Sequence, residues 1–413
     1  MIIDSKKYSG ICTCGKDHSM TTEFCIIEPG CMKNIGTYIE KYGIAGSCAA
    51  IYDENTYSAF GSLRPVADCE VVLPSENLHA DNHVVAETLK KLPPDCDYLI
   101  ALGSGTVHDI TRYCAYKMGI PFVSCPSAAS VDGFCSSVAA MTWDGFKKTF
   151  TASAPKIVVA DLDVISKAPF YLTKSGVGDV IGKYIALAEW KLGRLMKGEY
   201  FCTKIYNLTV QAVQAVKESA QNLADGDVTA YEKLTYGLLI SGIAMQLLGN
   251  SRCASGAEHH ISHLIEMQPK GLNAKSDALH GEKVGVGTLI AAREYHAVAE
   301  NYDIAWSDYP KIDDEYIADF FGDKLCQSII DENKNDTALG IHGSDIAANM
   351  DGIRKIISEI PSVEDLSVIY KRLNMKSTLD DIGVDGKNES IIKEYSPLVR
   401  NRLTLMRLRR CGF

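Results

Sequence analysis

The sequence lacks the segments that would place it in a membrane or direct it out of the cell. Its longest apolar run, "YGLLISGIAMQLLG" (Tyr236–Gly249), is too short and too interrupted to cross a bilayer, so it predicts a buried helix. The N-terminal "MIIDSKKYSGICTCG" has no apolar stretch of the kind found in secretory signal peptides. We therefore expect a cytoplasmic protein without membrane insertion.

Positive charge is also scarce. The chain has 42 Lys and Arg against 52 Asp and Glu, which gives a formal net charge of −10. Nucleic acids and anionic membrane surfaces both require a basic patch, so this balance argues against either as a partner. A small anionic substrate is still compatible, because local charge can differ in sign from net charge.

The fourteen cysteines lack the paired C-x2-C spacing of a zinc knuckle. The densest group begins with a C-x-C pair and continues irregularly through Cys12, Cys14, His18, Cys25 and Cys31. Without a visible signal peptide, the thiols are expected to stay reduced. The spacing favours free thiols over a metal site, and the role of this segment stays open.

The 413 residues suggest more than one domain, and the first part of the chain predicts a parallel sheet. Tyr98–Leu102 is a predicted strand, Thr106 to about Met118 a helix, and Pro121–Ser124 the next strand. Strand, helix and strand with short connections form a βαβ unit. Lys156–Asp163 predicts a further strand of the same sheet.

After about residue 170 the strand-like runs stop and long helical patterns follow. The predicted helices are Asp179–Leu195, Thr203–Ala224, Thr229–Gly249, Ser255–Met267 and Lys283–Glu300. Roughly 310–413 is charged and helical. We therefore predict a Rossmann-like α/β domain over residues 1–170 and an all-helical domain over residues 171–413. The apolar helix faces are compatible with a homo-oligomer, a dimer or larger.

The stretch "SGAEHHISHLIEM" places three histidines in five residues. Ser255 precedes Glu258 by three residues, which is the spacing of a capping box, so the helix is predicted to begin at Ser255 with Glu258 closing back on the cap amide. His259 and His263 share a helix face, whereas His260 is rotated away by about 100°. The helix dipole disfavours a protonated ring here, and a neutral ring is what a metal needs. A metal-binding pair and a solvated helix face both fit this pattern.

Two further segments add ligand types. In "DALHGEKVGVGT", His280 is predicted on an irregular segment ahead of a glycine-rich helix. In "SGVGDVIGKY", Asp179 follows a Gly-x-Gly turn and is predicted to open a helix, either as a charge at the helix N-terminus or as an oxygen ligand. One carboxylate and two imidazoles with an open position are typical of a catalytic metal site.

Three segments of the α/β part suggest dinucleotide binding. The glycines of "GSGTVHD" (Gly103–Asp109) follow a strand, where backbone amides at a helix N-terminus can approach a pyrophosphate. Asp53 ends the preceding strand and could accept a ribose 2′-hydroxyl or serve as a turn residue. The small hydroxylated segment "PSAASVDGFCSS" (Pro126–Ser137) could lie against nicotinamide and ribose, and Asp132 within it could hold substrate hydroxyls.

Five motifs in sequence order, "GSGTVHD", "PSAASVDGF", "GVGDVIGKY", "NSRCASGAEHHISH" and "LHGEKVGVGT", resemble those of the metal-dependent polyol dehydrogenases related to dehydroquinate synthase. The match is closest to the sn-glycerol-1-phosphate dehydrogenases and runs from about residue 40 to 290, with a looser tail. The resemblance implies a dehydroquinate synthase-like fold, a Rossmann-like domain followed by a helical domain.

The resemblance also implies roles for individual residues. Asp179, His259 and His280 would bind one divalent metal, usually zinc, although nickel, iron or manganese could occupy such a site. Asp132, Asp179 and His263 would contact the substrate. Asp53 would repel a 2′-phosphate and so leans towards NAD over NADP. The residues implied to line the dinucleotide are Asp53, Gly103, Gly105, Thr106, Val107, His108, Asp109, Ser127, Ala128, Ala129, Ser130 and Ser136.

The implied reaction is the NAD(P)-dependent interconversion of sn-glycerol 1-phosphate and dihydroxyacetone phosphate. Lys183 and Arg252 are the candidate partners of the substrate phosphate, with Lys283 behind them, unless they pair with local carboxylates. The rival functions are an unphosphorylated polyol dehydrogenase, a dehydroquinate-synthase-like lyase and a non-catalytic metal-binding protein. Two departures matter: Lys183 stands where iron-type relatives have a second histidine, and Asp179 where dehydroquinate synthase has glutamate.

Overall fold

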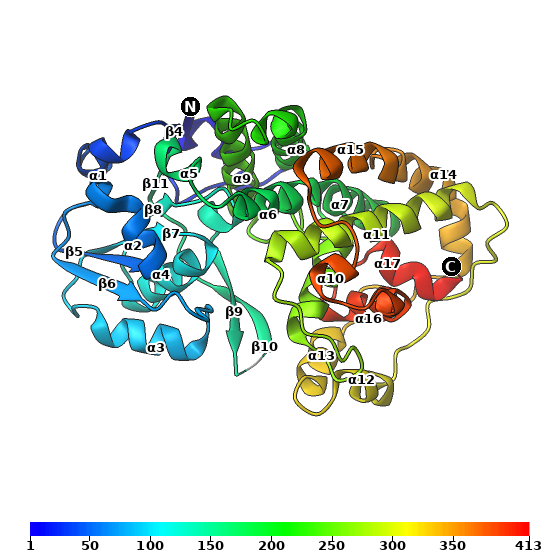
Figure 1. Cartoon of the computed structure of the whole chain (residues 1–413). Helices are drawn as coiled ribbons and strands as arrows, with labels where there is room; N and C mark the ends of the chain where they lie inside the picture. Colours follow the sequence, from blue (N-terminus) through cyan, green and yellow to red (C-terminus); the bar gives the residue numbers. More distant parts are fainter. Residues whose placement is uncertain (145, 413) are drawn as a thin grey trace. The chain divides into compact units, whose positions relative to one another are not determined.

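The computed structural model describes residues 1–144 and 146–412, and the chain forms two compact units (Figure 1). The first unit comprises Met1–Val180 and Asn207–Asn250, and the second comprises Ile181–Tyr206 and Ser251–Phe413. These units differ from the predicted division at residue 170, because the segment 207–250 returns to the unit that holds the sheet.

A seven-stranded sheet forms the centre of the first unit, with the strand order β1-β4-β11-β8-β7-β5-β6. All neighbours are parallel except β1 and β4, so the predicted parallel sheet is confirmed. The strands are β1 (Ile2–Asp4), β4 (Phe24–Glu28), β5 (Cys48–Asp53), β6 (Cys69–Leu73), β7 (Tyr98–Gly103), β8 (Phe122–Pro126) and β11 (Ile157–Asp161).

Both faces of this sheet are buried, which explains the continuous apolar runs of its strands. In β5, Ala50 and Tyr52 pack into a core on one face, whereas Ala49 and Ile51 pack into a core on the other. Side chains of α1 (Ile35–Lys41) and α2 (Glu54–Phe60) join the first core, and those of α3 (Asn82–Lys91) and α4 (Gly105–Met118) join the second. Two antiparallel ribbons complete the strands: β2 (Gly10–Ile11) with β3 (Asp17–His18), and β9 (Val138–Trp143) with β10 (Phe146–Thr151).

The remaining helices of the first unit are α5 (Leu162–Ile165), α6 (Phe170–Ile181), α8 (Thr203–Leu223) and α9 (Val228–Leu248), of which α6 and α8 each extend across a unit boundary. The predicted helices Thr203–Ala224 and Thr229–Gly249 agree with α8 and α9 within one residue. Helix α9 is buried on all sides from Gly237 to Gln246, which confirms the buried helix predicted from its apolar run. A helix that is apolar all round must be covered, and α9 packs against β4 and the 3-10 helix η4 (Asp132–Cys135).

Among the described residues of the second unit, all regular secondary structure is helical, as the texture of the sequence predicted. One predicted helix, Asp179–Leu195, is wrong at its start: α6 ends at Ile181, and α7 begins at Lys183 after Gly182. The helices are α7 (Lys183–Lys197), α10 (Ala257–Met267), α11 (His280–Glu300), α12 (Asp314–Phe321), α13 (Cys326–Asn333), α14 (Gly343–Ile357), α15 (Val363–Leu373), α16 (Glu389–Tyr395) and α17 (Leu405–Leu408). None of the helices in residues 1–144 and 146–412 combines the length and apolar character that a bilayer crossing needs.

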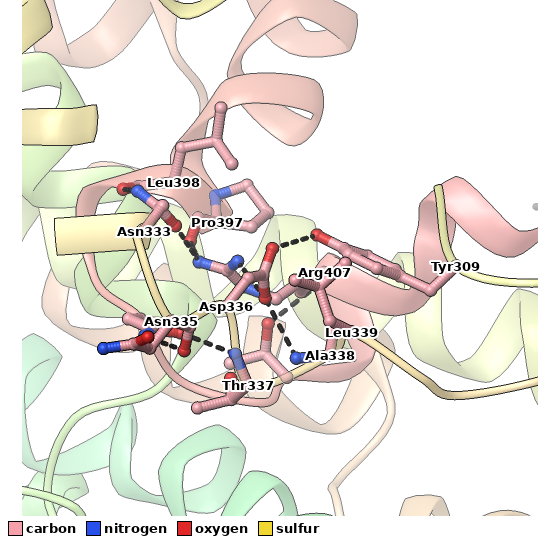
Figure 2. Close-up of polar contacts among 12 residues, drawn as sticks. Tyr309, Asn333, Asn335, Asp336, Thr337, Ala338, Leu339, Pro397, Leu398 and Arg407 are labelled. Carbon is pink, nitrogen blue, oxygen red and sulfur yellow. Dashed lines mark hydrogen bonds and ion pairs between the residues drawn. The ribbon is translucent and has the colours of Figure 1, made fainter. Parts of the chain in front are cut away.

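A buried arginine holds the C-terminal segment in place within this unit (Figure 2). The Arg407 side chain is fully buried and lies 2.8 Å from a carboxylate oxygen of Asp336. It also donates to the side chain of Asn333 at 2.8 Å and to the carbonyls of Pro397 and Arg400 at 2.6 and 2.9 Å. The hydroxyl of Tyr309 donates to the second oxygen of Asp336 at 3.0 Å. The Arg407–Asp336 pair therefore fixes the segment after α16 to the segment at the end of α13.

Candidate active site

Helix α10 carries the three clustered histidines, and it begins later than its sequence predicted. The helix starts at Ala257 with Gly256 as its N-cap, so the predicted start at Ser255 is wrong. A Cβ on Gly256 would lie 3.0 Å from the Cα of Ala186 in α7, so the close approach of α7 disfavours a larger residue there. The predicted role of Glu258 is confirmed, because its Oε1 accepts from the amide of the cap residue Gly256 at 2.8 Å.

Glu258 also fixes the ring of His259. The same Oε1 lies 2.7 Å from Nδ1 of His259, and the Glu258 side chain is fully buried. Since a carboxylate only accepts hydrogen bonds, Nδ1 carries the hydrogen and Nε2 carries the ring lone pair. Metal-ligating histidines almost always donate their other ring N–H, and a carboxylate is one of the usual acceptors.

His280 has the same arrangement on the neighbouring helix. It is the first residue of α11, not part of an irregular segment, which corrects its predicted setting. Its Nδ1 lies 2.9 Å from Oε1 of Glu266, a residue of α10 that sequence reasoning did not identify. The signal was available, because Glu266 is seven residues after His259 and therefore on its face of the helix.

The three histidine rings lie together in the second unit. The centroids of His259 and His280 are 5.3 Å apart, those of His263 and His280 5.8 Å, and those of His259 and His263 6.1 Å. Ligand atoms of His263, Glu266 and His280 lie within 4.8 Å of one another. The predicted fold-back of His280 onto the histidine helix is therefore observed.

A glycine permits this approach of the two helices. A Cβ on Gly287 of α11 would lie 2.6 Å from the carbonyl oxygen of Glu258, which is closer than real Cβ atoms come to backbone. The glycine-rich start of α11 thus serves helix packing, and the packing brings His280 to the face that carries His259.

His260 and His263 differ in their surroundings, because His260 is fully buried and His263 keeps part of its surface exposed. Neither ring nitrogen of His260 has a hydrogen-bond partner among the described residues, and burial lowers the pKa of this ring well below 6.5. Burial, followed by the charge of Arg400, likewise lowers the pKa of His263. Both rings are therefore neutral near pH 7, and only His263 lies in the ring cluster.

The first unit brings together the two candidate carboxylates of the substrate site. The amide of Asp132 donates to Oδ2 of Asp179 at 3.0 Å, and Oδ2 of Asp132 accepts from the hydroxyl of Ser241 in α9 at 2.8 Å. Asp179 is fully buried in the last turn of α6 and does not open a helix, so a role as an N-terminal helix charge is excluded. Ser241 was not predicted, and its position in an apolar run gave no indication of this contact.

Helix α6 lies tightly against the serine-rich loop that follows β8. A Cβ on Gly176 would lie 2.1 Å from the carbonyl oxygen of Ala129, so only glycine fits there. The hydroxyl of Ser175 donates to the carbonyl of Ser130 at 3.1 Å, whereas the buried hydroxyl of Ser130 has no partner among the described residues. Helix α6 therefore supports the loop Ser127–Ser130, and the Ser130 hydroxyl is a polar atom available to a bound molecule.

The predicted dinucleotide residues lie at the carboxyl ends of adjacent strands. Asp53 ends β5, Gly103 ends β7 and Ser127 follows β8, and the amide of Ser127 donates to the carbonyl of Gly103 at 2.9 Å. Helix α4 begins at Gly105, so the segment 105–109 forms its first turns. Crevices at the carboxyl ends of parallel strands are the usual binding sites of dinucleotides.

Asp53 has a local structural role as well. Its carboxylate accepts from the amide of Thr56 at 2.7 Å and caps α2. The sequence left a turn residue and a ribose acceptor as alternatives. The cap supports the first, while the second carboxylate oxygen leaves the ribose role open.

Two buried residues of α4 position the loop between β8 and β9. His108 lies 2.8 Å from the hydroxyl of Ser124 through Nε2 and 3.0 Å from the carbonyl of Ser104 through Nδ1, and burial lowers its pKa to about 3. Arg112, which was not predicted, is fully buried and donates to the carbonyls of Gly133, Phe134, Ser136 and Val138. His108 is thus a neutral packing residue, and Arg112 holds the segment that carries Asp132 and Ser136.

The predicted phosphate partners are all buried. Arg252 donates to both carboxylate oxygens of Glu199, at 2.9 and 3.0 Å, and to the carbonyl of Leu403 at 2.8 Å. Arg252 therefore has the local carboxylate partner that the sequence analysis gave as the alternative to a phosphate role. Lys283 lies 3.8 Å from Glu266, and Lys183 is fully buried at the start of α7.

Known proteins are similar to this chain in both sequence and fold. Residues 26–169 match the family described as iron-containing alcohol dehydrogenase. A glycerol-1-phosphate dehydrogenase (NAD(P)+) of Geobacillus thermodenitrificans (strain NG80-2) is 33% identical over 400 residues, which cover 94% of this chain and 92% of the relative. The chain belongs to the glycerol-1-phosphate dehydrogenase family. The family member from Geobacillus stearothermophilus is 32% identical over 409 residues, which cover 96% of this chain and 94% of that protein.

The resemblance carried by the five motifs is therefore confirmed, and so is the fold that it implied. The crystal structure of a probable glycerol dehydrogenase from Sinorhizobium meliloti 1021 matches with a TM-score of 0.62 and 16% identity, covering 94% of each chain. At that identity the match concerns the fold alone: a parallel-sheet N-terminal part followed by a helical C-terminal half. This chain thus has the fold of the iron-containing alcohol dehydrogenases.

Proposed function

We propose that this protein is a glycerol-1-phosphate dehydrogenase that interconverts sn-glycerol 1-phosphate and dihydroxyacetone phosphate with NAD or NADP and one divalent metal. One observation carries the proposal: His259 and His280 lie side by side, each with its Nδ1 held by a buried or half-buried carboxylate. The relatives named for this reaction match over more than nine-tenths of the chain.

The residues present fit a metal ion. The carboxylates of Glu258 and Glu266 fix the ring tautomers of His259 and His280, so that both Nε2 atoms are ligand atoms. Asp179, on the last turn of α6 two residues before the second unit begins, is the proposed oxygen ligand. Two nitrogens and one oxygen suit zinc, and nickel or iron are the alternatives for such a ligand set.

The proposed dinucleotide site is the carboxyl edge of β5, β7 and β8. Amides of the first turn of α4, from Gly105 to Val107, would face the pyrophosphate, and Ser127–Ser130 and Ser136 would face the nicotinamide ribose. The partnerless hydroxyl of Ser130 supports this placement. Asp53 favours NAD, since its carboxylate would repel a 2′-phosphate.

The bound groups would supply the hydride acceptor and the positive charge beside the substrate C2 oxygen. The chain's own residues would bind and orient the substrate. Asp132, fixed by Ser241 and by the hydrogen bond that its backbone amide donates to Asp179, would hold a substrate hydroxyl. The neutral ring of His263 would accept the alcohol proton directly or through a water. Lys183, a fully buried cation four residues after Asp179, is the proposed phosphate partner.

Location and assembly belong to the same proposal. A small phosphorylated substrate and nicotinamide cofactor are supplied in the cytoplasm, and no disulfide joins any of the described cysteines. We place the enzyme there as a homo-oligomer. Its acidic net charge of −10 speaks against nucleic acid as a partner.

The test mixes purified protein with NADH and dihydroxyacetone phosphate and follows the absorbance of NADH. We expect oxidation of NADH that stops on addition of a chelator and resumes with zinc, and a product that is the sn-1 enantiomer. His263→Ala should abolish turnover while the metal is retained, whereas His259→Ala should lose the metal. His260→Ala is the matched control on the same helix, and its metal content should equal that of the wild type.

Other outcomes would assign the rival functions. Faster oxidation of glycerol than of glycerol 1-phosphate would show an unphosphorylated polyol dehydrogenase. Conversion of a substrate without net change in NADH would show a lyase of the dehydroquinate synthase kind. Full turnover by Asp179→Asn would remove that residue from the metal site.

A further inference from the structure

The cysteine-rich N-terminus brings two thiols and an imidazole together within the first unit. Ligand atoms of Cys12, Cys14 and His18 lie within 4.8 Å of one another, and Sγ of Cys14 is 3.2 Å from Nε2 of His18. These residues are far from the histidine cluster in sequence, and the proposed reaction uses none of them.

A small hairpin produces this arrangement. Gly10 and Ile11 pair with His18 and Asp17, and between them the amide of Cys12 donates to the carbonyl of Lys16 at 2.9 Å. Gly15 has a φ of +86°, which lets the chain turn back. Strands of two residues are too short to be stable alone, so a hairpin of this size needs a further tie.

The imidazole is presented in the form that a metal requires. Nδ1 of His18 lies 2.9 Å from the carbonyl oxygen of Leu247 in α9, and the residue is only 2% exposed. Because a carbonyl oxygen only accepts, Nδ1 carries the hydrogen, and the lone pair of Nε2 points towards Cys14. A backbone carbonyl on the far nitrogen is a common support of metal-ligating histidines.

We propose that Cys12, Cys14 and His18 bind a zinc ion at a structural site separate from the catalytic metal. Thiolate and imidazole are the ligands of structural zinc sites, and tetrahedral bonds of 2.0–2.3 Å put neighbouring ligand atoms roughly 3.3–3.8 Å apart. The observed 3.2 Å between Cys14 and His18 is close to that spacing. A fourth donor completes the tetrahedron, and the experiment below identifies its element.

The ion would tie the N-terminal hairpin to the first unit. His18 connects the site to α9, and the amide of Thr21 donates to Oε1 of Gln246 on the same helix at 3.1 Å. Gln246 also donates to the carbonyl of Cys135 in η4, the 3-10 helix that begins at Asp132. Loss of the ion should therefore lower thermal stability and loosen the hairpin before it affects the chemistry.

The test exchanges the metals of the full-length protein for cobalt. The catalytic ligands are nitrogen and oxygen, so a thiolate-to-cobalt charge-transfer band reports the N-terminal site alone. We expect this band in the wild type and in His259→Ala, and its loss in the double variant Cys12→Ser with Cys14→Ser. Zinc content should fall by one equivalent per chain in that variant, and Cys69→Ser, a partly exposed cysteine in β6, is the control that keeps it.

X-ray absorption at the zinc edge of the wild-type protein provides a measurement that needs no variant. At least two sulfur neighbours at about 2.3 Å would support the site, and a third sulfur would identify the fourth donor as another cysteine. A coordination shell of nitrogen and oxygen only would overturn the proposal. So would a wild-type cobalt protein without the charge-transfer band, since the short contact would then be a thiol–imidazole hydrogen bond.

Discussion

Removal of the Glu258 carboxylate tests whether second-sphere hydrogen bonding fixes the metal ligands. Oε1 accepts from Nδ1 of His259 at 2.7 Å and from the amide of Gly256 at 2.8 Å. Glu258→Gln keeps an acceptor oxygen but removes the charge. Glu258→Ala removes the acceptor, so His259 is free to rotate and to change tautomer. The Gln variant should therefore weaken metal binding less than the Ala variant.

The expected losses are about 10-fold in metal affinity for Glu258→Gln and about 100-fold for Glu258→Ala, the range seen when outer-shell partners of metal ligands are mutated. In free energy this corresponds to about 1.4 and about 2.7 kcal/mol. The upper figure agrees with the loss of one hydrogen bond to a charged, fully buried partner, worth about 1.5–3 kcal/mol.

The assay measures turnover against buffered free zinc, which reports the catalytic metal and not the proposed N-terminal one. Both variants should need more zinc for half-maximal activity and should recover most of the wild-type kcat at saturation. Glu218→Gln, an exposed glutamate of α8, should leave the curve unchanged. A folded Glu258→Ala protein with the zinc dependence of the wild type would refute the orienting role.

The remaining predictions concern four buried ionisable side chains. Arg112→Lys should lower the free energy of unfolding in urea by about 3 kcal/mol and raise the KM for the dinucleotide, because an ammonium cannot reach all four carbonyls of the loop. Arg252→Ala should reduce turnover of glycerol and glycerol 1-phosphate equally, since Arg252 pairs with Glu199; a loss specific to the phosphorylated substrate would restore its phosphate role. Lys183→Met should instead raise the KM for glycerol 1-phosphate by at least about tenfold, with little change for glycerol. Burial raises the pKa of the Glu189 carboxyl group from 4.5 to about 8. The unfolded chain therefore loses the carboxyl proton at a lower pH than the folded protein, and stability should decline as pH rises from 4.5 through 8. Glu189→Gln should reduce this dependence of the melting temperature on pH.

Much of this architecture could be predicted from local patterns. In "LIALGSGT", the apolar run predicts a strand and the glycines predict the turn that leads into the following helix, and both are observed as β7 and α4. The bounds of α8 and α9 agree with their predictions within one residue. Helix phase alone separated His260 from His259 and His263. The ring cluster confirms that separation.

The failures lie where packing overrides local sequence. Gly176 and Gly178 suggested a turn before Asp179, yet both are helical residues of α6. Glycine is required at position 176 because the backbone carbonyl of Ala129 occupies the space that a Cβ would need. Ser255 has the spacing of a helix cap, but the approach of α7 makes Gly256 the cap. Arg112 had no motif to mark it, since four of its partners are backbone carbonyls of the loop, which leave no trace in the sequence.

The order in which the chain visits its two units has a consequence for synthesis. Residues 181–206 leave the first unit, and residues 207–250 return to it as most of α8 and all of α9. A nascent chain that has released only the strands therefore still lacks the apolar helix that covers β4 and η4. The first unit can complete its folding only after about residue 250 has left the ribosome, so its strands must wait with exposed apolar surface while α7 and α8 are made. Pauses in translation between residues 180 and 250 should therefore increase aggregation, whereas pauses after residue 250 should not.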